Sequence, residues 1–378
     1  MTQRACLIAI LHLLTPAVPS ASAWAQMTAD PLPRDSIAAR IGELQRIHTP
    51  EGIEVVEPLE VNGSTQWISI RGLNRANPIL LFVHGGPASP MMGSTWAYQK
   101  PWEDFFTVVN WDQRGVGKNY SPADTARLGP TMTDEQHRRD AEVVVRHVLE
   151  RLGQDKLILM GYSWGTMFTP QLVIDHPELF HAWVGLGVGA GGSEAALYAR
   201  VLELARLSDD TAAIRELEGL APYPAPGPMD IDRALTVRKW VRRYDGGWYG
   251  KPDLELFFAL NEWGAAYTAA DVAGLLDGNR WGARRLRRIE GSDGGVRFPV
   301  PVVFLMGRYD LHTSYDASKA YFERIEAPRK TFVTFERSAH MIMFEEPGRL
   351  LLTLVEEVLP LAGGAKAFEP QPDPPRRR

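Results

Sequence analysis

A serine near the middle of the chain lies in a sequence typical of an activated nucleophile. Residues 161–165 are Gly-Tyr-Ser-Trp-Gly, a G-x-S-x-G pattern that follows a short apolar run at 157–160 and precedes a segment with helical spacing. In a sharp strand-to-helix turn, small residues two positions before and after the serine let the backbone pass closely, so that the hydroxyl projects from the end of the strand. The sequence therefore predicts that Ser163 is a nucleophile at the carboxyl edge of a β-sheet.

Two residues late in the chain could activate this serine, which is a poor nucleophile until a base removes its proton. Asp310 and His340 each follow an apolar run of strand type, at 300–306 and 331–335. Loops that leave parallel strands at their carboxyl ends meet at one edge of the sheet. The chain order serine, aspartate, histidine is also the order expected with a G-x-S-x-G nucleophile. We predict His340 as the base and Asp310 as the carboxylate that orients it.

Three other residues are alternatives for these two roles. His312 is the rival base, but it lies two residues from Asp310 on the same loop, so a pair formed there would have to double back on itself. Glu194, which follows the preceding strand, and Asp316 are alternative acids. The sequence favours His340 and Asp310 over these three.

Acyl transfer also needs N–H donors for the oxyanion that develops during the reaction. One donor is expected from the residue after the nucleophile, which is Trp164, and the other from a loop that follows an earlier strand. His84-Gly85-Gly86-Pro87 follows the apolar run at 79–83, and its glycines allow the main chain to approach a substrate. We assign Gly86 as the second donor.

The composition excludes several classes of function. The chain has 378 residues and a formal net charge of −5, with 45% hydrophobic and 23% charged residues, which is typical of a soluble globular protein. This mildly acidic balance offers no broad attraction to nucleic acid or to an anionic membrane. The sequence contains no Gly-rich phosphate loop, no His-Glu-x-x-His run and no calcium loop. We therefore expect neither a cofactor nor a metal.

Strand-like and helix-like segments alternate along most of the chain. Besides the four apolar runs already named, runs at 107–111 and 183–188 are strand-like, whereas 134–152, 165–176 and 347–359 have helical spacing. This alternation predicts an α/β fold with a mostly parallel sheet covered on both faces. It pauses at 189–297, which is expected to be an inserted helical cap. The core would then comprise 31–188 and 298–362, followed by a disordered tail at 363–378.

The first 25 residues resemble a cleavable export signal. Arg4 precedes a mainly apolar run at 5–14, and Ala21-Ser22-Ala23 and Ala23-Trp24-Ala25 are small-x-small cleavage patterns. The apolar run is about half as long as the roughly 20 residues of a spanning helix. The sequence predicts a periplasmic or secreted protein that is not membrane-bound after cleavage. Its one cysteine, Cys6, would be lost with the signal.

Five motifs together resemble, in order and spacing, the proline iminopeptidase branch of the α/β-hydrolases. They are His84-Gly85-Gly86-Pro87, Asp112-Gln113-Arg114-Gly115, Gly161-Tyr162-Ser163-Trp164-Gly165, Gly307-Arg308-Tyr309-Asp310 and Ser338-Ala339-His340. The resemblance implies an eight-stranded α/β-hydrolase core with a helical cap, the same triad and oxyanion hole, and structural support from the second motif. The chain departs from the family at Ala88, where members usually have another glycine.

The resemblance also implies a substrate class. Members of the branch release N-terminal residues from peptides and hold the free amino group with glutamates of the cap. In this chain Glu262 is the first candidate for that role and Glu255 the second, because they lie within or next to an aromatic segment of the expected cap, residues 257–263. Two alternatives remain: an esterase or amidase that uses the same mechanism on a small molecule, and a non-catalytic binding protein that has kept the fold, which the intact triad disfavours.

Overall fold

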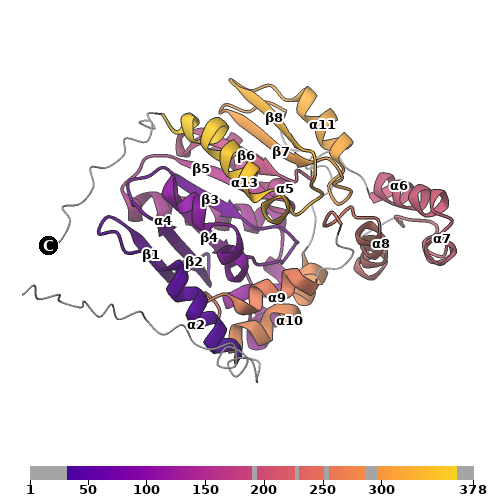
Figure 1. The fold of residues 1–378 in the computed structure, drawn as a ribbon, viewed down its shortest axis with the longest axis horizontal. Helices are drawn as coiled ribbons and strands as arrows, with labels where there is room; N and C mark the ends of the chain where they lie inside the picture. The colour runs from indigo at the N-terminus through magenta and orange to yellow at the C-terminus, as the bar shows by residue number, and fades with distance from the viewer. Residues whose placement is uncertain (1–31, 190–193, 226–229, 251–254, 287–295, 364–378) are drawn as a thin grey trace, which may run out of the picture.

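One eight-stranded sheet forms the centre of the described part of the molecule (Figure 1). The computed structural model describes residues 32–189, 194–225, 230–250, 255–286 and 296–363. The strand order is β1-β2-β4-β3-β5-β6-β7-β8; β1 pairs antiparallel with β2 and β2 antiparallel with β4, and the other neighbours are parallel. The strands are β1 (Ile53–Val61), β2 (Ser64–Gly72), β3 (Ile79–Val83), β4 (Thr107–Asp112), β5 (Leu157–Tyr162), β6 (Phe180–Leu186), β7 (Val302–Gly307) and β8 (Lys330–Phe335).

Helices surround this sheet and form an insertion between β6 and β7. The α-helices are α2 (Arg34–Gln45), α3 (Thr125–Leu128), α4 (Asp134–Leu152), α5 (Gly165–Asp175), α6 (Glu194–Leu207), α7 (Thr211–Glu218), α8 (Ile231–Arg243), α9 (Glu255–Trp263), α10 (Ala269–Arg285), α11 (Tyr315–Arg324), α12 (Ile342–Glu345) and α13 (Pro347–Thr353). Shorter 3₁₀ turns are η1 (Met92–Ala97), η2 (Lys100–Asp104), η3 (Gly117–Asn119), η4 (Pro122–Asp124), η5 (Gly129–Thr131), η6 (Pro177–Leu179) and η8 (Leu359–Ala362), and η7 (Leu354–Val358) is a π-helical turn.

The apolar runs of the sequence are strands because helices cover both faces of the sheet. Successive side chains of a strand point to opposite faces, so Leu81 and Val83 of β3 join one hydrophobic core, whereas Leu80 and Phe82 join the other. Both faces are buried, and all five residues of β3 are buried. A strand buried on both faces must be continuously apolar, which confirms the predicted mostly parallel sheet.

The hairpin β1–β2 was not recognised as two strands from the sequence. In β1 buried positions stand only at the two ends, and exposed and partly buried residues alternate between them, so the strand contains no apolar run. The turn between the strands is Asn62-Gly63, with φ of 45° and 75°. Asn-Gly between two extended segments is a strong hairpin signal, and it would have located this pair.

The helices between β6 and β7 form two groups rather than one (Figure 1). Helices α6, α7 and α8 share a small hydrophobic core of their own, which includes Leu197, Leu217 and Val237. Helices α9 and α10 lie beside α2 instead, and Arg34 at the start of α2 donates from Nε to the carbonyl of Glu262 at 2.7 Å. The predicted cap interval therefore holds two separately packed helical units.

The predicted terminal segments mostly lie outside the described residues. The expected signal at 1–25 is wholly outside them, and of the tail expected at 363–378 only Gly363 is described. Among the residues that the structure describes, none of the helices is both long and apolar enough to cross a bilayer.

Candidate active site

Ser163 occupies a strained turn between β5 and α5, as the sequence predicts. Its φ is 51°, a left-handed value that costs a non-glycine residue free energy. The flanking glycines are required by close approach: a Cβ at Gly161 would lie 2.8 Å from the carbonyl oxygen of Gly165, and one at Gly165 would lie 2.4 Å from that of Val83. The backbone N–H of Ser163 donates to the Leu186 carbonyl at 2.9 Å, which ties the turn to the end of β6.

The structure pairs His340 with Asp310. Nδ1 of His340 lies 2.7 Å from Oδ2 of Asp310, and the two side chains are buried. The Thr313 backbone N–H and hydroxyl donate to the same carboxylate at 3.0 Å and 2.7 Å. Because an ionised carboxylate only accepts hydrogen bonds, the imidazole carries its proton on Nδ1 and leaves Nε2 free to act as a base.

Two residues beside Ser163 hold the imidazole at the end of β6. Gly187 follows β6 with a φ of 58°, and a Cβ added there would lie 3.0 Å from Cε1 and from Nδ1 of His340. The ring of Tyr162, the residue before the serine, packs on the imidazole with centroids 5.1 Å apart, and its hydroxyl donates to the His340 carbonyl at 3.1 Å. The sequence analysis did not identify Gly187 or Tyr162. A glycine at the carboxyl end of a central strand was the available signal.

The loop that carries Gly86 lies against the serine. A Cβ added at Gly85 would lie only 2.8 Å from Cβ of Ser163, so no side chain fits between the loop and the nucleophile. Gly86 has a φ of 128°, which a residue with a side chain rarely adopts. Trp164 stands at the N-cap of α5, where backbone N–H groups lack helical partners. Of the two predicted oxyanion donors, Trp164 thus directly follows Ser163, and Gly86 follows the glycine that lies against it.

His84 and Gln113 fix the position of this loop. The Gln113 backbone N–H donates to Nε2 of His84 at 3.2 Å, and the Gln113 side-chain amide donates to the His84 carbonyl at 2.9 Å. Nδ1 of His84 contacts the Gly85 carbonyl oxygen at 2.9 Å and must be the protonated nitrogen. Burial lowers the pKa of His84 to about 4. His84 is thus a neutral structural residue at neutral pH.

Two other residues of the motif at 112–115 bond to elements outside the sheet. Arg114 donates from Nε to the Asp140 carboxylate at 2.7 Å in a fully buried pair, which connects the turn to α4. Asp112 accepts from the Tyr267 hydroxyl at 2.9 Å, which connects it to the segment between α9 and α10. Burial raises the pKa of Asp112 to about 7. These contacts support the expectation that the motif is structural.

Helix α10 lies over the loop that carries Gly86. The Asn279 side chain donates to the Ala88 carbonyl at 2.8 Å and to the Ser89 hydroxyl at 2.9 Å. Ala88 has a φ of 65°, a conformation that favours the glycine usual at this position in the family. Its methyl group faces Gly282, where an added Cβ would lie only 2.5 Å away. Gly282 on α10 therefore leaves space for the methyl group of Ala88.

The three alternative residues do not pair as an acid and a base. The ring of His312 stacks on that of His340 with centroids 5.1 Å apart, and it is Nδ1 of His340 that bonds to Asp310. Glu194 accepts from Arg238 at 3.1 Å and from the Tyr223 hydroxyl at 2.7 Å, both within the α6–α8 unit. Asp316 is exposed in the first turn of α11. The geometry therefore favours the predicted pair.

The two glutamates predicted to bind the substrate amine belong to α9. The hypothesis required a buried carboxylate, but the side chain of Glu262 on α9 is exposed. It is exposed because the apolar residues of α9, such as Phe257 and Leu260, occupy the buried side of the helix. Glu255 begins α9, and its side chain lies outside what the structure describes. The Glu262 carboxylate is thus in contact with solvent in this structure, and its role as the amine ligand stays a prediction.

A glutamate that the sequence analysis missed lies close to His340. The Glu345 carboxylate accepts from the Ala339 backbone N–H at 3.1 Å and from the Tyr249 backbone N–H at 2.5 Å. It thereby joins the histidine loop to the segment after α8. Burial raises the pKa of Glu345 to about 7.

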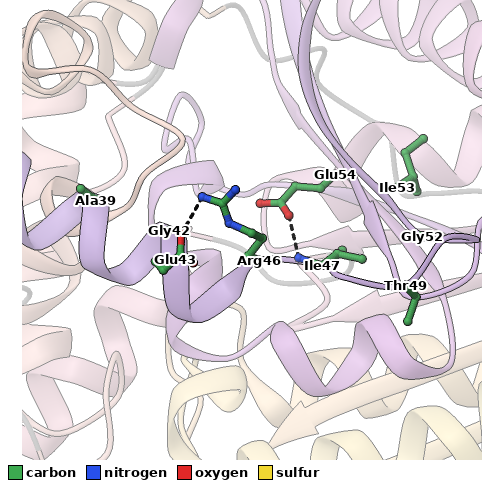
Figure 2. A pocket seen from close by; sticks show the side chains of 9 residues that line it. All are labelled: Ala39, Gly42, Glu43, Arg46, Ile47, Thr49, Gly52, Ile53 and Glu54. Atoms are coloured by element: carbon green, nitrogen blue, oxygen red, sulfur yellow. Dashed lines mark hydrogen bonds and ion pairs between the residues drawn. The ribbon is translucent and has the colours of Figure 1, made fainter. Parts of the chain in front are cut away.

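One surface pocket of the molecule lies away from these residues (Figure 2). It is lined by α2 and the start of β1, and its charged groups are satisfied locally: Arg46 pairs with Glu43 at 2.6 Å, and Glu54 accepts from the Ile47 N–H at 2.8 Å. None of the predicted site residues lines it. The described residues also contain no group of three or more His, Cys, Asp or Glu side chains that could hold a metal ion.

Comparison with known proteins identifies the class of protein. The family model described as the alpha/beta hydrolase fold matches residues 78–347, and the chain belongs to this family of hydrolases. Its relatives include a probable aminopeptidase of Bacillus subtilis (strain 168), which is 31% identical over 311 residues that cover 80% of this chain and 96% of the relative. A proline iminopeptidase of Saccharolobus solfataricus is 23% identical over 305 residues, covering 76% and 86%. The chain thus falls in the proline iminopeptidase-like branch, which confirms the resemblance.

Solved structures agree with this fold. A proline iminopeptidase of Mycobacterium smegmatis superimposes with a TM-score of 0.56 at 15% identity, covering 82% of this chain and 99% of that one. A proline iminopeptidase-related protein of Thermus thermophilus gives a TM-score of 0.54 at 20% identity, covering 80% and 96%. At these identities the likeness establishes the fold alone.

Proposed function

We propose that the protein is a serine hydrolase in which Ser163, His340 and Asp310 act as a triad. The observation that carries this proposal is the 2.7 Å contact between Nδ1 of His340 and Asp310. Tyr162, the residue before Ser163, packs on the same imidazole, and Ser163 itself has a left-handed φ of 51°. A carboxylate on Nδ1 fixes the tautomer in which Nε2 can take the serine proton. Gly187, at the end of β6, and Tyr162, at the end of β5, both lie against this imidazole.

The proposed reaction passes through an acyl-enzyme. His340 removes the proton of Ser163 as its Oγ attacks the substrate carbonyl, and the N–H groups of Gly86 and Trp164 stabilise the resulting oxyanion. The imidazolium then donates its proton to the leaving group, and an acyl-serine remains. A water molecule, activated by the same histidine, hydrolyses this ester and restores Ser163.

We further propose that the substrates are peptides from which N-terminal residues are released. The support comes from the relatives, among them the probable aminopeptidase of Bacillus subtilis at 31% identity and the proline iminopeptidases. An esterase or amidase acting on a small molecule remains the second candidate, because the same triad and oxyanion hole serve both reactions.

Three substrates separate these two activities. We expect the purified protein to cleave a proline arylamide faster than a p-nitrophenyl ester, and acetylation of the proline nitrogen to lower kcat/KM by roughly a hundredfold or more. That size corresponds to the loss of a charge-assisted hydrogen bond in a site with little water. Equal rates on the free and acetylated arylamides would reject the aminopeptidase and leave the esterase or amidase.

We also propose that the protein is exported after cleavage of its first segment. The support is Arg4, the apolar run at 5–14 and the Ala-x-Ala patterns that end at Ala23 and Ala25. N-terminal sequencing of the protein from its native host should begin at Trp24, Gln26 or close by. Recovery of soluble cytoplasmic protein that still begins at Met1 would overturn export.

A further inference from the structure

Two basic side chains that pack against Gly247, near His340, have no acceptor within the described protein. Arg242 on α8 and His312 in the Asp310 loop both approach Gly247: a Cβ added there would lie 3.1 Å from Cγ of Arg242 and 3.0 Å from Nε2 of His312. The Gly247 carbonyl accepts the backbone N–H of His340 at 3.1 Å. Both side chains therefore pack against Gly247, the residue whose carbonyl accepts the His340 N–H.

The contrast with Arg238 shows what Arg242 lacks. Arg238 lies one helical turn earlier on α8, and its guanidinium pairs with the Glu194 carboxylate. Arg242 is partly buried, yet no described carboxylate lies within ion-pair distance of it. Burial and the neighbouring charge of Arg238 lower the pKa of Arg242. A partly buried guanidinium without an acid is unfavourable unless a ligand supplies one.

His312 supplies a second unused donor at the same place. Its ring stacks on that of His340 with centroids 5.1 Å apart and planes inclined by 29°, and neither of its nitrogens has a hydrogen-bond partner among the described residues. Burial, together with the charges of His340, Arg238 and Arg242, lowers the pKa of His312 well below its usual value. The ring is therefore neutral at neutral pH and can donate one hydrogen bond.

The position next to His340 indicates which part of the substrate these donors would meet. His340 gives its proton to the leaving group, so the leaving group must come close to this ring and to the residues beside it. When a dipeptide is cleaved, the leaving group is an amino acid whose carboxylate is two bonds from the nitrogen that receives the proton. A guanidinium and an imidazole N–H are suitable partners for that carboxylate.

We propose that Arg242 and His312 form a subsite for the free carboxylate of the leaving amino acid, so that the enzyme prefers dipeptides. This inference rests on the proposed aminopeptidase function. It names a specificity determinant for that function, and neither residue takes part in bond breaking.

The test compares a dipeptide with its amide, such as prolyl-glycine with prolyl-glycinamide. In the wild-type protein kcat/KM for the free acid should exceed that for the amide by roughly tenfold or more, the effect of one charge-assisted hydrogen bond. Arg242→Gln should bring this ratio to about one, and Arg242→Lys, which keeps the charge, should retain part of it. Arg243→Gln is the matched control: Arg243 is the adjacent, exposed residue of α8, and this variant should keep the wild-type ratio.

The outcomes distinguish this inference from the function on which it rests. The readout is the ratio of two kcat/KM values measured on one preparation. A smaller fraction of folded protein in a variant lowers both values equally and leaves the ratio unchanged. Cleavage of acid and amide at equal rates by the wild type, or an unchanged ratio in Arg242→Gln, would overturn the subsite and leave the aminopeptidase intact. Cleavage of neither peptide would overturn both.

Discussion

Gly187 gives a sharp test of how the imidazole is positioned, because it touches the triad without belonging to it. In Gly187→Ala the new methyl carbon would lie 3.0 Å from Cε1 and Nδ1 of His340 and 3.5 Å from Oδ2 of Asp310. Carbon atoms prefer separations of about 3.5–4.0 Å. The imidazole of His340 is a rigid ring that is hydrogen-bonded to Asp310. It must therefore move by about half an ångström or lose that hydrogen bond.

The expected magnitude combines two effects. An alanine at a φ of 58° loses about 1 kcal/mol of stability relative to glycine through backbone strain. Displacement of a reacting group by about 1 Å can cost about 10²-fold in rate, so a shift of about half that size should lower kcat by roughly tenfold. We expect the loss in kcat rather than in KM, because the substrate-binding groups stay in place.

Gly153→Ala is the matched control for backbone strain. Gly153 ends α4 with a φ of 65°, and an added Cβ there would meet no atom within 4 Å. Thermal unfolding should show similar decreases in Tm for both variants, whereas steady-state kinetics should show loss of activity only in Gly187→Ala. Wild-type kcat in Gly187→Ala, or an equal loss in Gly153→Ala, would refute the argument that Gly187 acts by leaving room for His340.

Three further variants test the triad, the core and the cap. Asp310→Asn should lower kcat by about 10⁴-fold, because an amide cannot hold the His340 tautomer, and a loss below tenfold in kinetic assays would contradict that role. Burial raises the pKa of Asp112 from 3.8 to about 7, so the folded protein keeps a proton that the unfolded chain releases. The free energy of unfolding should therefore fall as the pH rises from about 4 to about 7, and Asp112→Asn should remove that part of the slope in denaturation curves measured across this range; an unchanged slope would contradict the raised pKa. Asn279→Ala removes the bonds from α10 to Ala88 and Ser89, worth about 1 kcal/mol each, and should raise KM severalfold; an unchanged KM would show that α10 does not order the loop for substrate.

Local sequence signals predicted the parts of the site that depend on local geometry. Ser163 could be located because a strand-to-helix turn needs glycines at 161 and 165, and both are tightly packed in the structure. His340 and Asp310 could be located because each follows a strand of the sheet, and parallel strands end at the same edge. The order of these residues along the chain was therefore enough to predict that their side chains meet at one edge of the sheet.

The remaining features depend on packing between distant segments. Gly187 matters only because His340, more than 150 residues later, lies against it. The exposure of Glu262 depends on which side of α9 packs against the core. The aromatic residues around Glu262 did not show which side that would be. Likewise, Arg242 differs from Arg238 only because Glu194 of another helix pairs with one and not the other. No periodicity along the chain encodes these contacts.

The most direct measurement of the central claim is labelling with a fluorophosphonate, which reacts with activated serines. The wild-type protein should be labelled once, with the modified peptide containing Ser163. Ser163→Ala should not be labelled and should lose about 10⁶-fold in kcat, while its thermal unfolding curve stays that of the wild type. Labelling at another residue, or activity near that of the wild type in Ser163→Ala, would contradict the assignment of Ser163 as the nucleophile.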